Sequence, residues 1–207
     1  MSSNVSVVWD KPKGEPSAVV VLAHGAGGDL NDSLLAAVAK GLSTKGIAVV
    51  RFNFPYREAG RRAPGSQAEA EACYRDVVSR VRVDGAPLCC GGKSYGGRIA
   101  SHVAADGLGM DGLVFLGYPL HAPGRTDKLR DAHLGGITAP MLFVQGTRDS
   151  FARPDLLASV VLRLHNATLV SVDGGDHSLR VRGRNTADIY NELTGAIAGF
   201  VSGLNVG

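Results

Sequence analysis

Short runs of β-branched and aliphatic residues alternate along the chain with longer segments in which apolar residues recur every three or four positions. The runs are typical of buried strands, and the longer segments are typical of helices that pack on a sheet. The predicted strands are residues 18–23, 47–52, 87–90, 112–116, 141–145 and 168–172. The predicted helices are residues 33–44, 67–82, 95–105, 154–164 and 186–201.

This alternation predicts a mostly parallel sheet of about six to seven strands, and right-handed crossovers place helices on both of its faces. Residues 5–9 add an edge strand, which a Pro- and Gly-rich turn allows to run antiparallel. The connections 56–66 and 120–139 are the long ones, and neither has room for a separate cap domain. We expect one α/β domain over residues 1–207, with its core at about 18–202, and leave open whether 120–139 forms a lid.

Composition limits the classes of partner. The 207 residues include 44% hydrophobic and 20% charged residues, which fits one domain with a sizeable core. The net charge is only +3, and the basic residues are scattered apart from Arg57, Arg61 and Arg62, so no nucleic-acid partner is expected.

The three cysteines indicate a reducing compartment, because their spacing fits neither a disulfide framework nor a metal site. Cys89 and Cys90 are neighbours in a predicted strand and point to opposite faces. The N-terminal segment lacks a basic and an apolar region, and no stretch approaches the roughly 18 apolar residues of a membrane span. These features predict a soluble cytoplasmic protein without a membrane partner, as a monomer or homodimer.

The segment Gly92-Lys93-Ser94-Tyr95-Gly96 matches the pattern Gly-x-Ser-x-Gly. In this pattern the glycines permit a sharp turn that projects the serine hydroxyl above the sheet at the start of a helix. Five residues are a weak signal, but a predicted strand precedes them and a predicted helix follows. The sequence therefore predicts Ser94 as a nucleophile, and the alternative is a glycine-rich turn with an incidental serine.

A serine nucleophile needs a base, and the base needs an acid that orients it. Of the six histidines, His177 lies in a glycine-rich loop after the last predicted strand, so we expect it to be the base. Asp149 follows strand 141–145 at the edge where open α/β sheets bind ligands, which predicts it as the acid. Asp173 and Asp176, which lie closer to His177 in the sequence, are alternatives.

Acyl transfer passes through an oxyanion that needs two backbone N–H donors. We expect one from Tyr95 and the other from the loop His24-Gly25-Ala26-Gly27-Gly28, whose small residues let the backbone approach a substrate. Ala26 is the first candidate, and Gly27 is the alternate. This loop could instead cradle phosphate, but it lacks the lysine of a P-loop and the spacing of a dinucleotide-binding loop.

Other side chains are candidates for substrate contacts. His24, Tyr56, Tyr118 and His121 follow predicted strands, and Arg98 comes four positions after Ser94. Cations at this edge of the sheet would attract an anionic substrate. The plainer alternatives are solvated arginines, a structural ion pair for Arg98, and packing for Tyr118.

With these residues in place, the sequence resembles the α/β-hydrolase superfamily, and within it a compact branch without a cap, near the dienelactone hydrolases. The resemblance covers residues 18–202 and rests on the segments HGAGG, RFNFPY, GGKSYGGR, LGYPLHAPG, LFVQGTRD and GGDHSL. These segments look like those of small predicted hydrolases related to a testis-expressed protein and to a chromatin-complex subunit. Dienelactone hydrolases use a cysteine nucleophile where this chain has Ser94, so dienelactone is a poor substrate candidate.

The resemblance implies Ser94, Asp149 and His177 as the catalytic triad, the backbone of Ala26 and Tyr95 as the oxyanion hole, and no metal or cofactor. We expect a serine hydrolase that cleaves a carboxylic ester or thioester of a small-molecule substrate through an acyl-enzyme. Two alternatives remain. One is a catalytically silent domain that binds or assembles, as the chromatin-associated relative implies, and the other is a peptidase or acyltransferase with the same triad.

Overall fold

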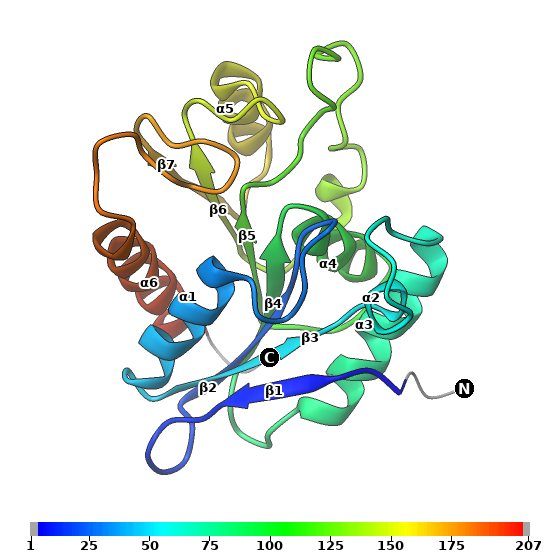
Figure 1. Ribbon diagram of the computed structural model, residues 1–207, viewed down its shortest axis with the longest axis vertical. Coiled ribbons are helices and arrows are strands. Elements are labelled where there is room, and N and C mark those ends of the chain that lie inside the picture. Colours follow the sequence, from blue (N-terminus) through cyan, green and yellow to red (C-terminus); the bar gives the residue numbers. More distant parts are fainter. Residues whose placement is uncertain (1–3, 205–207) are drawn as a thin grey trace.

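A seven-stranded sheet forms the centre of the computed structural model, which describes residues 4–204 (Figure 1). The strands are β1 (Val7–Asp10), β2 (Ala18–Ala23), β3 (Ile47–Phe52), β4 (Leu88–Lys93), β5 (Gly112–Leu116), β6 (Met141–Gly146) and β7 (Ala167–Val172). Their order across the sheet is β1-β3-β2-β4-β5-β6-β7. β1 pairs antiparallel with β3, and the other neighbours pair in parallel. The predicted single-domain α/β fold, with an antiparallel edge strand, is confirmed.

Helices cover both faces of the sheet. α1 (Ser33–Ser43) and α6 (Thr186–Ser202) lie side by side on one face, as Figure 1 shows. α3 (Gln67–Val81), α4 (Tyr95–Ala105) and α5 (Pro154–Arg163) pack on the other. Each face therefore has its own apolar core.

Burial on both sides explains the uninterrupted apolar runs of the central strands. All six residues of β2, Ala-Val-Val-Val-Leu-Ala, are buried, and alternate ones belong to the two different cores. Cys89 and Cys90 divide in the same way, which confirms that they point to opposite faces.

Local sequence sets where the helices begin. The Asp32 carboxylate accepts hydrogen bonds from the backbone N–H groups of the first turn of α1, and Ser66 and Asn185 cap α3 and α6 in the same way. Pro154 occupies the first position of α5, where a missing N–H is harmless.

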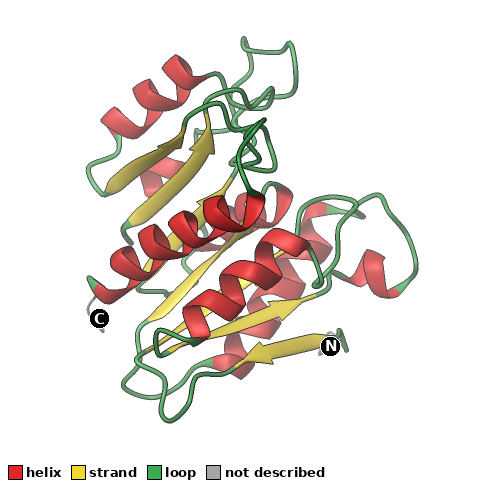
Figure 2. Ribbon diagram, turned by 60° about the vertical axis from the view of Figure 1, so that its left-hand side comes forward, coloured by secondary structure: helices red, strands yellow, loops and turns green. Residues whose placement is uncertain are grey.

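The two long connections contain single turns that sequence periodicity did not predict. These are α2 (Pro55–Glu58) and the 3₁₀ turn η1 (Leu134–Gly136), both too short to show a helical repeat. Neither connection adds a cap. In Figure 2 the arrowheads of the parallel strands point toward the longer loops, so the connections that follow β2, β4, β5, β6 and β7 meet at one edge of the sheet.

Candidate active site

Three predicted side chains form a continuous hydrogen-bonded chain at that edge. His177 Nε2 lies 2.8 Å from Ser94 Oγ, and His177 Nδ1 lies 2.7 Å from Asp149 Oδ2. Ser94 follows β4, Asp149 follows β6, and His177 follows β7. The carboxyl ends of three parallel strands thus bring together residues that are up to 83 positions apart in the sequence.

The surroundings of Asp149 fix its carboxylate. Its side chain is fully shielded from solvent. Besides His177, Oδ2 accepts a hydrogen bond from Gln145 Nε2 at 2.5 Å, and Oδ1 accepts one from the Phe151 N–H at 2.8 Å. The Phe151 ring lies against the imidazole of His177, with the ring centroids 4.3 Å apart. Asp149 therefore holds His177 in one orientation.

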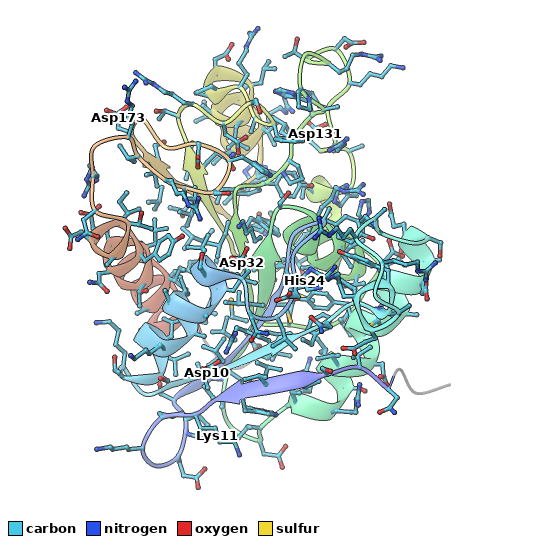
Figure 3. The ribbon with its side chains drawn as sticks, viewed as in Figure 1. Asp10, Lys11, His24, Asp32, Asp131 and Asp173 are labelled. Carbon is cyan, nitrogen blue, oxygen red and sulfur yellow. The ribbon has the colours of Figure 1, made fainter. Side chains whose placement is uncertain are left out.

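Among the described residues, neither alternative acid forms a hydrogen bond to the His177 imidazole. Asp173 Oδ1 accepts a hydrogen bond from the Thr147 hydroxyl, and Figure 3 shows Asp173 at the periphery of the molecule, beside β7. Asp176 Oδ1 accepts the N–H groups of Ser178 and Arg180. Both carboxylates therefore shape neighbouring loops, and the geometry favours Asp149 as the partner of His177.

Ser94 sits on a strained turn between β4 and α4. Its φ of 50° and ψ of −113° lie in a region that costs a non-glycine residue about 1–3 kcal/mol. Its N–H donates to the Leu116 carbonyl at 2.9 Å, which pins the turn against β5. A Cβ on Gly92 or Gly96 would overlap the Ala23 carbonyl oxygen, so both glycines of the motif are required by close backbone approach.

The loop after β2 lies directly beside the nucleophile. A Cβ on Gly25 would be 3.5 Å from Ser94 Cβ. A hydrogen bond from the Gly28 N–H to the Gly25 carbonyl closes a tight turn, in which Gly27 has a φ of 76°. Ala26 and Tyr95 both line the cavity above Ser94, whereas Gly27 does not. This placement favours Ala26 over Gly27 as the second oxyanion donor.

A largely buried ion pair ties this loop to the elbow. Lys93 Nζ, next to the nucleophile, lies 2.7 Å from Asp32 Oδ2. Because the other oxygen of Asp32 caps α1, one carboxylate joins the start of α1 to the end of β4. Figure 3 shows Asp32 and His24 near the middle of the molecule.

The cavity above Ser94 has a volume of about 350 Å³ and is open to solvent. This volume falls at the low end of the range of small-molecule sites. It is lined by Ala26, Pro64, Gly65, Gln67, Ser94, Tyr95, Arg98, Pro119, Arg130 and Phe151. The site thus offers a nucleophile, two candidate oxyanion donors and two cations around one small hollow.

A second serine–histidine pair lies deeper in the protein. Ser101 Oγ is 2.7 Å from His133 Nε2, but Ser101 is fully buried and its hydroxyl also donates to the Arg98 carbonyl. The Tyr118 hydroxyl lies 3.5 Å from the same Ser101 oxygen. Ser101 lines no wall of the cavity, so only the pair of Ser94 and His177 can reach a substrate there.

The sequence matches the family described as "Alpha/beta hydrolase domain" over residues 16–202. The chain belongs to this α/β-hydrolase family. Solved structures share its fold. An α/β serine hydrolase homologue from Coxiella burnetii is 20% identical, with a TM-score of 0.75, and the match covers 97% of this chain and 98% of that chain.

Two further hydrolase structures resemble this one. A dienelactone hydrolase from Anabaena variabilis is 16% identical with a TM-score of 0.76, covering 99% of this chain and 95% of its own. A serine hydrolase without lid from Xanthomonas campestris is 24% identical with a TM-score of 0.70, covering 96% and 88%. The predicted capless branch near the dienelactone hydrolases is confirmed, and the narrower resemblance to the testis-expressed and chromatin-associated proteins stays a prediction.

Four of the predicted substrate contacts in this α/β hydrolase need correction. His24, Tyr56, Tyr118 and His121 are at most 2% exposed, and none lines the cavity. The ring nitrogens of His121 bond to Ala122 O and to the Arg153 N–H. Each of these four side chains packs in the interior rather than facing the hollow, which contradicts the predicted substrate contacts.

The interior phenols and His24 have structural partners. The Tyr118 hydroxyl donates to Arg130 O at 2.9 Å. The Tyr56 ring packs on His24 and Phe54, and burial raises its pKa to about 12. Burial likewise raises the pKa of Tyr118 to about 12. Of the predicted contacts, only Arg98 remains on the wall of the cavity.

Sequence reasoning missed several residues of the α/β-hydrolase site. Phe151 contacts His177, and Gln145 donates to Asp149. Both lie within four positions of Asp149, so the end of β6 and the loop after it were the signal that could have found them. Gly117 lies so close to His177 that a Cβ there would be 2.7 Å from the His177 carbonyl oxygen. No local pattern pointed to Arg130 or Gln67.

Residues 4–204 contain neither a metal-binding cluster nor a membrane-spanning helix. Within that range, no cluster of three or more His, Cys, Asp or Glu side chains is arranged to hold a metal ion. The helices of the same range are each too short or too polar to cross a bilayer.

Proposed function

We propose that this α/β hydrolase is a serine esterase or thioesterase with Ser94 as nucleophile, His177 as general base and Asp149 as the orienting acid. The observation that carries this proposal is the continuous chain Asp149–His177–Ser94, with distances of 2.7 and 2.8 Å, which ends in an open cavity. A serine hydroxyl held by a histidine that a buried carboxylate orients is the arrangement of acyl transfer.

In the proposed reaction, His177 Nε2 takes the Ser94 proton while Oγ attacks the acyl carbon. The negative charge that develops on the carbonyl oxygen is bound by the N–H groups of Tyr95 and Ala26, at the positive end of α4. His177 then gives its proton to the leaving group, and a water activated by the same imidazole releases the acid from the acyl-enzyme. Throughout, Asp149 stabilises the imidazolium.

The small open cavity favours short acyl groups. Since the chain has no cap and the hollow holds about 350 Å³, a long lipid chain would remain largely in water. We therefore expect turnover of short-chain esters to exceed that of esters with long acyl chains.

Fluorophosphonate labelling of the purified protein, together with hydrolysis of 4-nitrophenyl butyrate, tests the proposal. We expect both activities in the wild type and neither in Ser94→Ala. Ser101→Ala is the matched control, because it removes the other serine that pairs with a histidine and should keep both activities. A folded wild type that neither labels nor hydrolyses would contradict the proposal and favour a binding or assembly role.

A further inference from the structure

Two arginines from separate parts of the fold face the cavity that contains Ser94. Arg98 lies in the first turn of α4, and Arg130 lies in the connection between β5 and β6. The Arg98 guanidinium hydrogen-bonds Gln67 Oε1 at 3.5 Å and lies 5.7 Å from the centre of the Tyr95 ring. Arg130 donates to Pro119 O at 3.3 Å. Both side chains are thus held against the wall by neutral partners.

Neither cation has a carboxylate partner within 4 Å among residues 4–204. The other partly or fully buried arginines of that range, Arg51, Arg57 and Arg75, each form an ion pair. The remaining arginines that lack an ion pair are exposed to water, where a charge needs no partner. Arg98 and Arg130 are therefore exceptional in being partly buried, charged and unpaired.

Their positions concentrate positive potential at the cavity. Arg98 stands in the first turn of α4, where the helix dipole disfavours a cation. Helical side chains lean toward the helix N-terminus, so Arg98 extends over the turn that carries Ser94. Burial, and then the charge of Arg98, lower the pKa of Arg130. Two acidic groups of α3, Glu69 and Glu71, lie near this wall, and neither pairs with Arg98 or Arg130 among residues 4–204. The Glu71 carboxylate accepts the Gln67 amide, and Glu69 Oε2 lies where a Cβ on Gly65 would be only 2.7 Å away.

We propose that Arg98 and Arg130 form an anion subsite that selects substrates whose acyl chain ends in a carboxylate. This inference rests on the proposed hydrolase function and adds the class of substrate. Two guanidinium groups can bind one carboxylate through charge-assisted hydrogen bonds, and the anion offsets the repulsion between them. Pro119 and Phe151, which line the same cavity, provide apolar surface for the methylene groups between the ester and the carboxylate.

A matched pair of esters tests this inference. Mono(4-nitrophenyl) adipate and 4-nitrophenyl hexanoate have acyl chains of equal length, and only the adipate carries a terminal charge. We expect the wild type to prefer the adipate in kcat/KM by about tenfold, and Arg98→Gln or Arg130→Gln to reduce that preference by about tenfold each. Arg80→Gln is the matched control, because Arg80 pairs with Asp76 on the exposed surface of α3, and it should keep the preference.

Two further measurements separate failure of the subsite from failure of the hydrolase. Raising NaCl from about 0.05 M to about 0.5 M should lower the preference of the wild type itself, since salt screens accessible charges, and this needs no folded variant. Calorimetric titration of Ser94→Ala with adipate should show binding that Arg98→Gln abolishes, whether or not the protein turns over esters. If the protein labels with the phosphonate but hydrolyses the hexanoate as well as or better than the adipate, the subsite is refuted and the hydrolase function stands. The same conclusion follows if neither salt nor either variant changes the preference for the adipate.

Discussion

Replacement of Asp149 by asparagine gives the sharpest test of how the triad is oriented. In the native site, Oδ1 accepts the Phe151 N–H while Oδ2 accepts both Gln145 Nε2 and the Nδ1–H of His177. An asparagine amide has the same shape but offers only one acceptor oxygen. The Phe151 N–H cannot move, so it retains the oxygen, and the new NH₂ group takes the place of Oδ2.

That NH₂ group would face His177 Nδ1 as a donor. The imidazole then accepts at Nδ1 and carries its proton on Nε2, where it cannot take the proton of Ser94. Gln145 can adapt, because its buried Oε1 has no hydrogen-bond partner among the described residues and can turn to accept from the new amide. The Asp149→Asn protein should therefore fold, yet present the wrong histidine tautomer to the nucleophile.

The expected loss in kcat is about 10⁴-fold, the magnitude known for this change in serine protease triads, or about 5.4 kcal/mol of transition-state stabilisation. Steady-state hydrolysis of 4-nitrophenyl butyrate measures it, with thermal unfolding as the test of folding. Asp173→Asn is the matched control and should retain activity, since among residues 4–204 that carboxylate accepts a hydrogen bond from the Thr147 hydroxyl and none from His177. A folded Asp149→Asn protein within tenfold of wild-type kcat would refute the assignment.

Two further predictions concern stability. Tyr74→Phe removes a buried hydroxyl that donates to the Gly91 carbonyl and accepts from the Gly91 N–H. It should therefore lower the free energy of unfolding, measured by urea titration, by about 1–3 kcal/mol. An unchanged free energy of unfolding would show that β4 does not depend on this hydroxyl. Burial, His102 and Arg98 lower the pKa of His133 to about 4. In the unfolded chain His133 has a pKa near 6.5, so between these two pH values it binds a proton that the folded chain excludes. The contribution of His133 to the free energy of unfolding therefore falls as the pH drops from 6.5 toward 4. Between about pH 7 and about pH 5, the Tm of His133→Gln should fall by less than the Tm of the wild type. An equal fall in both proteins would contradict the link between His133 protonation and stability.

The sheet could be predicted because its central strands are buried on both faces, which leaves continuous apolar runs such as residues 18–23. The meeting of Ser94, Asp149 and His177 could also be predicted, since each of them follows a predicted strand and parallel strands end at one edge. Position along a strand therefore predicted the edge and the loops where these three side chains meet. Position along a strand did not predict whether a side chain faces the cavity or the interior.

Tyr118 and Arg130 illustrate that limit. Gly117 adopts a φ of 66°, and the chain after it turns so that the Tyr118 hydroxyl lies inside, on Arg130 O. The residue expected to contact substrate is thus a buried support, while Arg130, twelve positions later, reaches the cavity because the connection folds back and its N–H donates to Leu120 O. A long loop's path depends on such tertiary contacts, and no local periodicity encodes it.

His24, which was predicted to contact substrate, instead supports the backbone beside the site. Nδ1 lies 2.8 Å from the Gly25 carbonyl and Nε2 accepts the Phe54 N–H, so the two nitrogens need opposite roles, which only a neutral imidazole supplies. Burial lowers the pKa of His24 and keeps it in that neutral form. The ring thereby ties the Gly25 carbonyl, which directly precedes Ala26, to the Phe54 backbone before any substrate arrives. Because an oxyanion hole works through donors that need no reorganisation, a buried histidine behind the loop serves the proposed reaction better than one that touches the substrate.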